Sequence, residues 1–175
     1  MTSPEPDPID AVLRSDHAAI TRDLAALRTD ASGAGERFTQ LSADIVRHFV
    51  AEEQYLLPAV RRHLEGGDRI SDDEFAEHER IEKILRRLDD DDDQPVDATI
   101  GELERALAEH VSRQESSLIP QLVAALDPDT LAELGEGALG AEQLAPTHPR
   151  AFVPKSATVS KVASWIEGLV DKSVG

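Results

Sequence analysis

Histidine and glutamate stand one helical turn apart in the segment HFVAEEQYLLP, which begins at His48. Leu41, Ile45 and Leu56 share the helix face of this pair, because consecutive members of the set are three or four positions apart. That face is expected to point inward, so His48 and Glu52 occupy places where leucines would normally lie. Burial of an imidazole and a carboxylate is costly unless they pair or bind a metal ion. The pair is therefore a candidate metal site.

A weak two-fold repeat supplies three more histidines for such a site. The segment HVSRQESSLIP, which begins at His110, repeats the His, Glu, Leu and Pro of the first segment. The segments DHAAITRDL and EHERIEKIL both place an acid before a histidine, which is His17 in one and His78 in the other. Two helical hairpins with a histidine in each helix would form an antiparallel up-down four-helix bundle, with all four histidines at similar depth. This arrangement favours a metal site over unrelated core histidines.

The composition restricts both the ligands and the partners. The chain has 175 residues, of which 40% are hydrophobic and 3% aromatic, so its core is mainly aliphatic, as suits helices. It has no cysteine, so nitrogen and oxygen atoms must hold any metal ion. The net charge of −17 repels phosphate backbones and anionic lipids, so we expect neither nucleic acid nor a membrane as a partner. The opening MTSPEPDPID has no secretory character, and we expect a cytoplasmic location.

Capping and helix-breaking residues predict the helices that carry the four histidines. The first helix follows Asp7-Pro8, and the second runs from about residue 36 to 64, with Pro58 loosening the turn before it. Ser71 and Glu74 form a capping box at which the third helix is expected to begin. The fourth runs from about residue 96 to 126. Residues 8–126 are thus the predicted bundle.

A C-terminal extension over residues 127–175 is expected to follow the bundle. It begins with a short helix that fades through three glycines, at positions 135, 137 and 140. A Pro-containing extended segment and a last amphipathic helix around Trp165 come after it. This extension is the expected place for self-association or for a protein partner.

The combined motifs resemble the hemerythrin-like proteins, also called HHE cation-binding domains. The resemblance covers about residues 10–126 and implies a four-helix bundle that holds two non-haem iron ions with an oxo or hydroxo bridge, although other divalent metals are compatible with the ligands. It implies that one metal is bound by His17 and His48, the other by His78 and His110, and that Glu52 and Glu115 bridge them.

Two departures from the family pattern concern the second metal. O2-carrying members have a second histidine four residues before the one that matches His78, whereas this chain has Glu74, which either reaches a metal or, in the favoured interpretation, caps the third helix. In the fourth helix, spacing like that of the second selects Gln114, and the family's five-residue spacing selects Glu115. Carboxylate chemistry favours Glu115, whose counterpart Glu53 is a weaker alternative to Glu52.

Three further residues are weaker candidates. Tyr55 lies about one turn beyond Glu52 and either donates a hydrogen bond to a bridging carboxylate, as a second-shell group, or packs in the core. His63 stands at a helix end, where a cationic side chain interacts favourably with the helix dipole, and His148 in the extended tail is expected at the surface.

The resemblance and the ligand set lead to two main hypotheses. The first is a di-iron protein that binds or reacts with O2, peroxide or nitric oxide, and one activity open to it is catalase-like disproportionation of peroxide, because the missing histidine leaves a metal more open. The alternative is an iron or redox sensor that acts through a partner without turnover. A third, metal-free structural bundle leaves four imidazoles and two carboxylates in the core with few partners.

Overall fold

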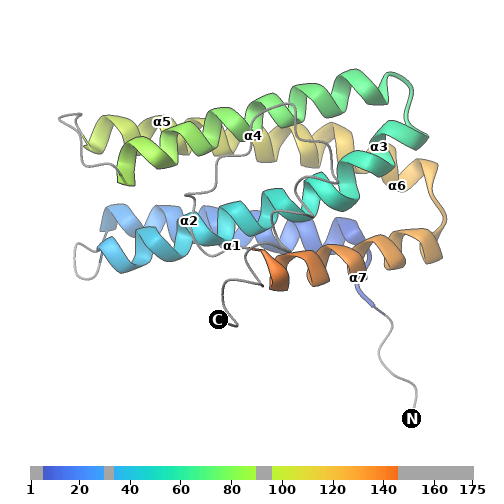
Figure 1. Cartoon of the computed structure of the whole chain (residues 1–175), viewed down its shortest axis with the longest axis horizontal. Helices are drawn as coiled ribbons and strands as arrows, with labels where there is room; N and C mark the ends of the chain where they lie inside the picture. Colours follow the sequence, from blue (N-terminus) through green and yellow to red (C-terminus); the bar gives the residue numbers. More distant parts are fainter. Residues whose placement is uncertain (1–5, 30–33, 90–95, 146–175) are drawn as a thin grey trace, which may run out of the picture.

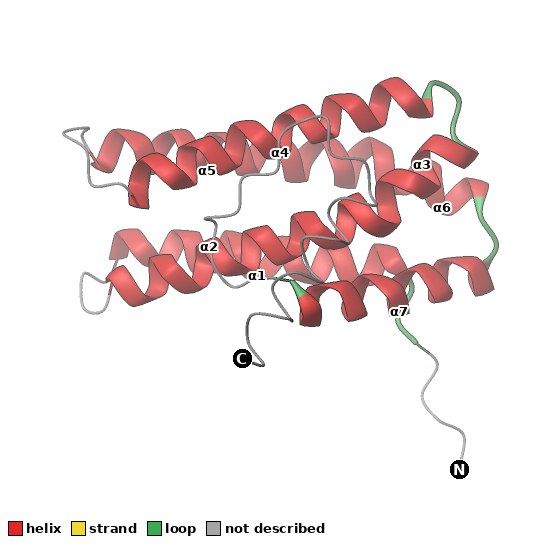
Figure 2. Ribbon diagram, in the orientation of Figure 1, coloured by secondary structure: helices red, strands yellow, loops and turns green. Residues whose placement is uncertain are grey.

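The computed structural model describes residues 6–29, 34–89 and 96–145, and within these ranges every regular element is a helix (Figures 1 and 2). The all-helical fold class is thereby confirmed, and the helices lie side by side as a bundle. The α-helices are α1 Ile9–Thr29, α2 Ala34–Ala51, α3 Leu57–His63, α4 Gly67–Asp89, α5 Val96–Arg113, α6 Ile119–Ala125 and α7 Pro128–Leu144.

The long helices form four rods, which are α1, α2 continued by α3, α4, and α5 continued by α6. Two of these rods are interrupted by a widened turn. The π-helical segment Glu52–Leu56 joins α2 to α3, and Gln114–Leu118 joins α5 to α6. In each, the last residue before proline donates its N–H five residues back, from Leu57 to Glu52 and from Ile119 to Gln114. Pro58 and Pro120 lack an N–H and crowd the preceding turn, which explains the widening. The predicted loosening before Pro58 is confirmed.

The third long helix begins earlier than its capping box predicts. Helix α4 starts at Gly67, so Ser71 lies inside it, fully buried, and donates a hydrogen bond to the carbonyl of Leu57 at 3.1 Å. The prediction that Ser71 and Glu74 cap the helix is therefore wrong. Gly66 adopts a left-handed φ of 69°, and a Cβ on Gly67 would lie 2.2 Å from the Val60 carbonyl oxygen. Only glycines allow so tight a connection between α3 and α4.

The core consists of two apolar layers with a polar layer between them. Along α1, Leu13 belongs to one apolar cluster and Ile20 to the other, and His17 lies between them. Along α2 and its continuation, Ile45 and Leu56 belong to different clusters in the same way. The apolar residues thus fix the helices above and below the level of the histidines, which are themselves removed from water.

Helix α7 packs on α1 and α2 and runs through all three of its glycines, so the prediction that it fades there is wrong. A Cβ at Gly135 would lie 2.0 Å from the Asp7 carbonyl oxygen, and one at Gly137 would lie 2.1 Å from the Tyr55 ring. These two glycines let α7 approach its neighbours closely, and that packing outweighs their low helix propensity. Asp127 caps the helix by accepting a hydrogen bond from the Thr130 N–H at 2.9 Å.

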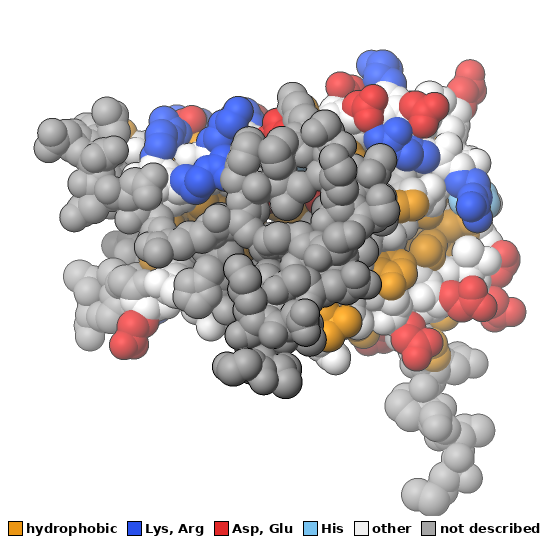
Figure 3. Space-filling model, viewed as in Figure 1, with side chains coloured by type: hydrophobic (Ala, Val, Ile, Leu, Met, Phe, Trp, Pro, Cys, Tyr) orange, Lys and Arg blue, Asp and Glu red, His pale blue; other side chains and the backbone are white. Residues whose placement is uncertain are grey.

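The surface near α6 and α7 carries hydrophobic side chains among charged ones (Figure 3). The exposed large hydrophobic residues in the described ranges are Val123, Leu139 and Leu144. No helix in these ranges combines the length and the apolar character needed to cross a bilayer. The predicted extended segment, the last amphipathic helix and His148 lie outside the described residues, and the boundary at residue 126 stays a prediction.

Candidate metal centre

Seven polar residues occupy the layer between the two apolar clusters. Their side chains come from all four long rods, and none of the seven residues is more than 2% exposed. They are His17, His48, Glu52, Glu74, His78, His110 and Gln114. The predicted common depth of the four histidines is thus observed. The layer also contains Glu74 and Gln114, for which the sequence left alternatives open.

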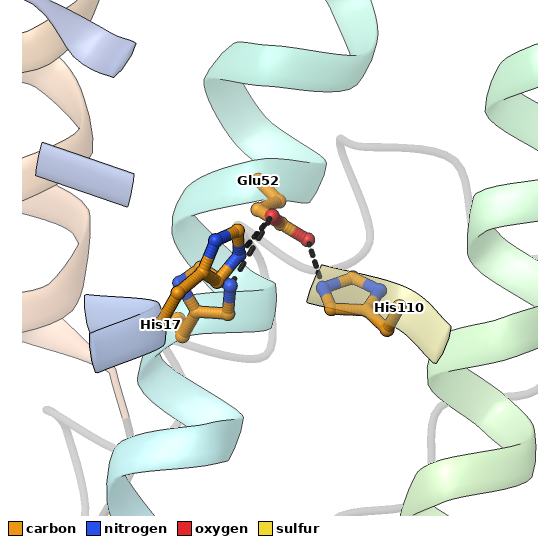
Figure 4. Close-up of side chains that lie close together, drawn as sticks. His17, Glu52 and His110 are labelled. Carbon is orange, nitrogen blue, oxygen red and sulfur yellow. Dashed lines mark ion pairs between the residues drawn. The ribbon is translucent and has the colours of Figure 1, made fainter. Parts of the chain in front are cut away.

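The four imidazoles present their Nε2 atoms to one carboxylate, that of Glu52. Figure 4 shows His17 and His110 on either side of this carboxylate. Glu52 Oε1 lies 3.9 Å from His17 Nε2 and 3.2 Å from His48 Nε2. Its other oxygen, Oε2, lies 2.9 Å from His78 Nε2 and 3.6 Å from His110 Nε2. Each carboxylate oxygen therefore faces one pair of histidines. A carboxylate placed in this way has the disposition of a bridging ligand between two metal positions.

The other ring nitrogen of each histidine faces a carboxylate from a neighbouring rod. His17 Nδ1 lies 3.0 Å from Glu115 Oε1, and His78 Nδ1 lies 2.9 Å from Glu53 Oε1. His48 Nδ1 lies 3.3 Å from Asp16 Oδ2. His110 Nδ1 lies 3.6 Å from Glu74 Oε2, which is longer than a hydrogen bond. Carboxylates in this position orient imidazoles and fix the tautomer whose Nε2 carries a lone pair for a metal.

Stacking orients one of these imidazoles further. The Phe49 ring lies parallel to the His78 ring, with 4.0 Å between the centroids. Phe49 is 1% exposed, so its ring is fixed in the apolar layer and holds the imidazole against it.

Burial and the central carboxylate set the charges of the metal-free site. Burial alone would raise the pKa of Glu52, but the nearby charge of His48 and the hydrogen bond with His78 lower it well below its usual range. Burial would likewise lower the pKa values of His48 and His78, yet contacts with Glu52 and the flanking acids raise them to about 9 and about 10. Burial dominates at His110 and lowers its pKa to about 2.

Several atoms of the layer have no hydrogen-bond partner among the residues that the structure describes. They are the Nε2 atoms of His17 and His48, both ring nitrogens of His110, Oε1 of Glu52 and Oε1 of Gln114. Buried polar atoms are rarely left unpaired, because each one costs about 1–3 kcal/mol. Nitrogen and carboxylate donors that converge without hydrogen-bond partners fit a metal ion.

Two groups of side chains could each hold such an ion. One comprises His17, His48, Glu52 and His110, and the other comprises Glu74, His78 and His110. Within each group the potential ligand atoms lie within 4.8 Å of one another. His110 belongs to both groups, so the two candidate positions adjoin each other at this residue.

Glu74 belongs to this layer and not to a helix cap. Its Oε1 accepts a hydrogen bond from Arg113 Nε at 2.7 Å, and its Oε2 accepts one from Gln114 Nε2 at 2.9 Å. Glu74 is 2% exposed, whereas the Arg113 side chain is 43% exposed. The favoured interpretation of Glu74 as a cap is therefore wrong, because α4 begins at Gly67, about one turn earlier than that interpretation required.

The structure places Gln114 inward and Glu115 at the edge of the layer. The Glu115 side chain is 34% exposed and contacts His17 and Arg14. The widened turn begins at Gln114, so residue 114 keeps the helix face of His110 and residue 115 is rotated aside. Glu115 lies in neither ligand group of this structure, and its role as a bridging ligand stays a prediction.

Helix α7 reaches the site through Glu142. Burial together with the charge of the nearby Asp16 carboxylate raises the pKa of Glu142 to about 7. A protonated Glu142 can donate to Asp16, which in turn faces His48 Nδ1. The sequence reasoning missed Asp16 and Glu53 as partners of histidines, although both acids stand beside a histidine or a glutamate of the repeat.

The remaining candidates lie away from the ligand atoms. The Tyr55 ring meets α7 at Gly137 and packs against buried apolar residues, so the structure favours its packing role, and its hydrogen bond to a bridging carboxylate stays a prediction. His63 lies at the end of α3, as its sequence position predicts, and is exposed.

Comparison with known proteins identifies the family. Searches of curated proteins and of solved structures gave no match. A family model, the hemerythrin HHE cation-binding domain, matches residues 9–122, a range that includes every side chain of the two ligand groups. Together with the polar layer, this match shows that the chain belongs to the hemerythrin HHE cation-binding family.

Proposed function

We propose that the chain is a hemerythrin-like, antiparallel four-helix protein with a dinuclear non-haem iron site that binds or reacts with O2, peroxide or nitric oxide. The observation that carries the proposal is the convergence of four Nε2 atoms on the two oxygens of Glu52. His17 and His48 would hold one ion on the Oε1 side, and His78 and His110 would hold the other on the Oε2 side. Glu74 is an additional ligand candidate for the second ion.

The nitrogen and oxygen donor atoms of the site are ligands that iron accepts. The residues present fit a cation, because nitrogen and carboxylate donors without hydrogen-bond partners face one another. Two iron ions would supply one-electron redox chemistry toward small oxygen species. Nitrogen and oxygen donors also bind copper and zinc, so the metal carried in the cell depends on supply as well as on intrinsic affinity.

The protein around the site restricts what can react there. The four histidines and Glu52 are at most 2% exposed, so the site suits a diatomic molecule or a peroxide and excludes an organic substrate of metabolite size. Glu53 and Glu115, whose side chains are 19% and 34% exposed, connect buried Nδ1 atoms with the surface. They can hold the Nδ1 protons of His78 and His17 when the charge of the site changes.

Metal content and spectroscopy test the proposal. Natively purified protein is expected to contain two irons per chain, and its absorption is expected to change when O2, peroxide or nitric oxide is added to the anaerobic protein. The variant His78→Leu is expected to retain one iron, and His63→Leu, outside the site, to retain two. Iron-loaded protein whose spectrum responds to none of the three molecules would refute the proposed reactivity. Oxygen evolution from peroxide distinguishes catalase-like turnover from binding.

A sensing role is the second candidate, favoured by the contacts that join the site to every rod. Because the histidines are held by carboxylates from neighbouring helices, metal occupancy is coupled to helix packing. A sensor is expected to show a large metal-dependent rise in melting temperature without turnover of peroxide. Turnover at a rate well above that of free iron would exclude it.

A further inference from the structure

The two halves of the repeat differ at three positions that lie in contact with one another. When His17 is aligned with His78 and His48 with His110, Leu13 corresponds to Glu74. In the same alignment Ala51 corresponds to Arg113, and Glu52 corresponds to Gln114. In the second half these replacements form one hydrogen-bonded cluster of Glu74, Arg113 and Gln114.

The replacements move a carboxylate from one helix to another and add a cation. In the first half the carboxylate is Glu52, while Leu13 and Ala51 are fully buried apolar residues. In the second half the carboxylate stands on α4, and the position that corresponds to Glu52 carries an amide that donates to it. The second position thus keeps its carboxylate, but an arginine that has no counterpart in the first half now binds it.

The two carboxylates are consequently not equally available to a metal ion. Every ion pair of Glu52 in the described part of the chain is with a histidine, and its Oε1 has no hydrogen-bond partner there. Both oxygens of Glu74 accept a hydrogen bond, one of them from a guanidinium. The same cluster keeps Glu74 Oε2 3.6 Å from His110 Nδ1, whereas the other three histidines lie within 3.3 Å of their carboxylates.

Arg113 can leave this cluster without being buried elsewhere. Its side chain is 43% exposed at the end of α5, so its stem already lies at the surface and the guanidinium can turn into water. The Glu74 carboxylate cannot follow, because it is 2% exposed and stands in mid-helix. A metal ion that displaces Arg113 would therefore find a fixed carboxylate beside His78 and His110.

We infer that Arg113 is a built-in competitor for the second metal position, so that the two positions fill in order. The position of His17, His48 and Glu52 fills first, and the position of Glu74, His78 and His110 fills second, with the release of Arg113 from Glu74. This inference rests on the proposed dinuclear site and adds its regulation. Loss of a charge-assisted hydrogen bond weakens the second binding step by about 10- to 100-fold.

Titration of the metal-free full chain with Co2+ tests the order of filling. Calorimetry measures the two binding steps, and the visible absorption of Co2+ reports how many ions have nitrogen and oxygen ligands. The wild type is expected to bind two ions in separate steps. Arg113→Met, which keeps the aliphatic stem and removes the charge, is expected to tighten the second step by about 10- to 100-fold and leave the first unchanged. Arg105→Met, an exposed arginine on the same helix, serves as the matched control and is expected to change neither step.

A second variant keeps the test decisive if Arg113→Met does not fold. Glu74→Gln removes the carboxylate but keeps a neutral partner for Arg113, and it is expected to retain the first step and lose the second. The inference is overturned if Arg113→Met leaves the second step unchanged or weaker, or if Glu74→Gln still binds two ions. Absence of any binding by the wild type would instead overturn the proposed dinuclear site itself.

Discussion

Replacement of His110 by leucine is expected to stabilise the metal-free protein and to abolish most of its response to metal. His110 is 1% exposed, its pKa is lowered to about 2 by burial, and neither ring nitrogen has a hydrogen-bond partner in the described residues. The metal-free protein therefore contains a neutral imidazole with two unpaired polar atoms. Each such atom costs about 1–3 kcal/mol, and leucine fills a similar volume without them.

The expected gain without metal follows from these atoms. Some of the cost is recovered by the nearby Glu52 and Glu74 carboxylates, so we expect a net stabilisation of about 1–3 kcal/mol. For a chain of this size, this corresponds to a melting temperature higher by about 2–10 °C. The stabilisation that bound metal provides should decrease, because His110 belongs to both ligand groups. If its loss weakens binding about 100-fold, a metal stabilisation of about 2.7 kcal/mol falls to less than about 0.5 kcal/mol.

Thermal unfolding of chelator-treated protein, followed by circular dichroism, measures both effects. The same samples are then melted with ferrous iron under anaerobic conditions. His63→Leu replaces an exposed histidine at the end of α3 and should change neither curve. A His110→Leu variant that melts lower than the wild type without metal, and gains as much from iron, would refute the reasoning about unpaired ligand atoms.

Three further predictions concern the surroundings of the site. Glu115→Gln leaves His17 Nδ1 without its carboxylate and is expected to weaken metal binding about 10- to 100-fold, measured by competition with a chromophoric chelator, and an unchanged affinity would contradict it. Burial and the charge of Glu53 raise the pKa of Glu82 to about 7 from its usual 4.5, so the folded protein loses stability as pH rises from about 4.5 to 7. Glu82→Gln should therefore stabilise the metal-free protein by about 1–3 kcal/mol at pH 8 and by nothing below pH 4.5 in urea unfolding, and an equal effect at both pH values would exclude this cause. Gly135→Ala should lower the melting temperature, because the added Cβ meets the Asp7 carbonyl oxygen. Gly140→Ala has open space around it and should increase the free energy of unfolding by up to about 1 kcal/mol. Similar effects at both sites in thermal unfolding would contradict the close packing of α7.

Helical periodicity was sufficient to predict the common depth of the histidines. His17, His48, His78 and His110 each replace an apolar residue on an inward face, and the repeat gives them the same level, which the structure confirms. The acids behind their outer nitrogens were not predicted, because contacts between helices depend on the rotation of each rod, which a single sequence does not specify.

The errors have identifiable physical causes. The start of α4 was misplaced because Ser71 and Glu74 match a capping box, yet the two glycines before them permit a tighter turn and an earlier start. Helix α7 was predicted to fade because glycine has low helix propensity, but packing against α1 and α2 overrides that preference. Whether residue 114 or 115 lies on the inward face depends on where the π-helical turn begins, which the residues around Pro120 do not specify, and the role of Glu115 as a ligand stays a prediction.

The contacts behind the histidines also constrain when the protein can acquire a metal. His48 is held from α1, His78 from the segment after α2, and His17 from the segment after α5. The last of these contacts joins residues 98 positions apart, so it closes only after almost the whole bundle has been synthesised. A nascent chain that ends before α5 has three of the four histidines but lacks the fourth rod that completes the enclosure. The candidate metal site is thus completed only at the end of folding, when the fourth rod has joined the other three.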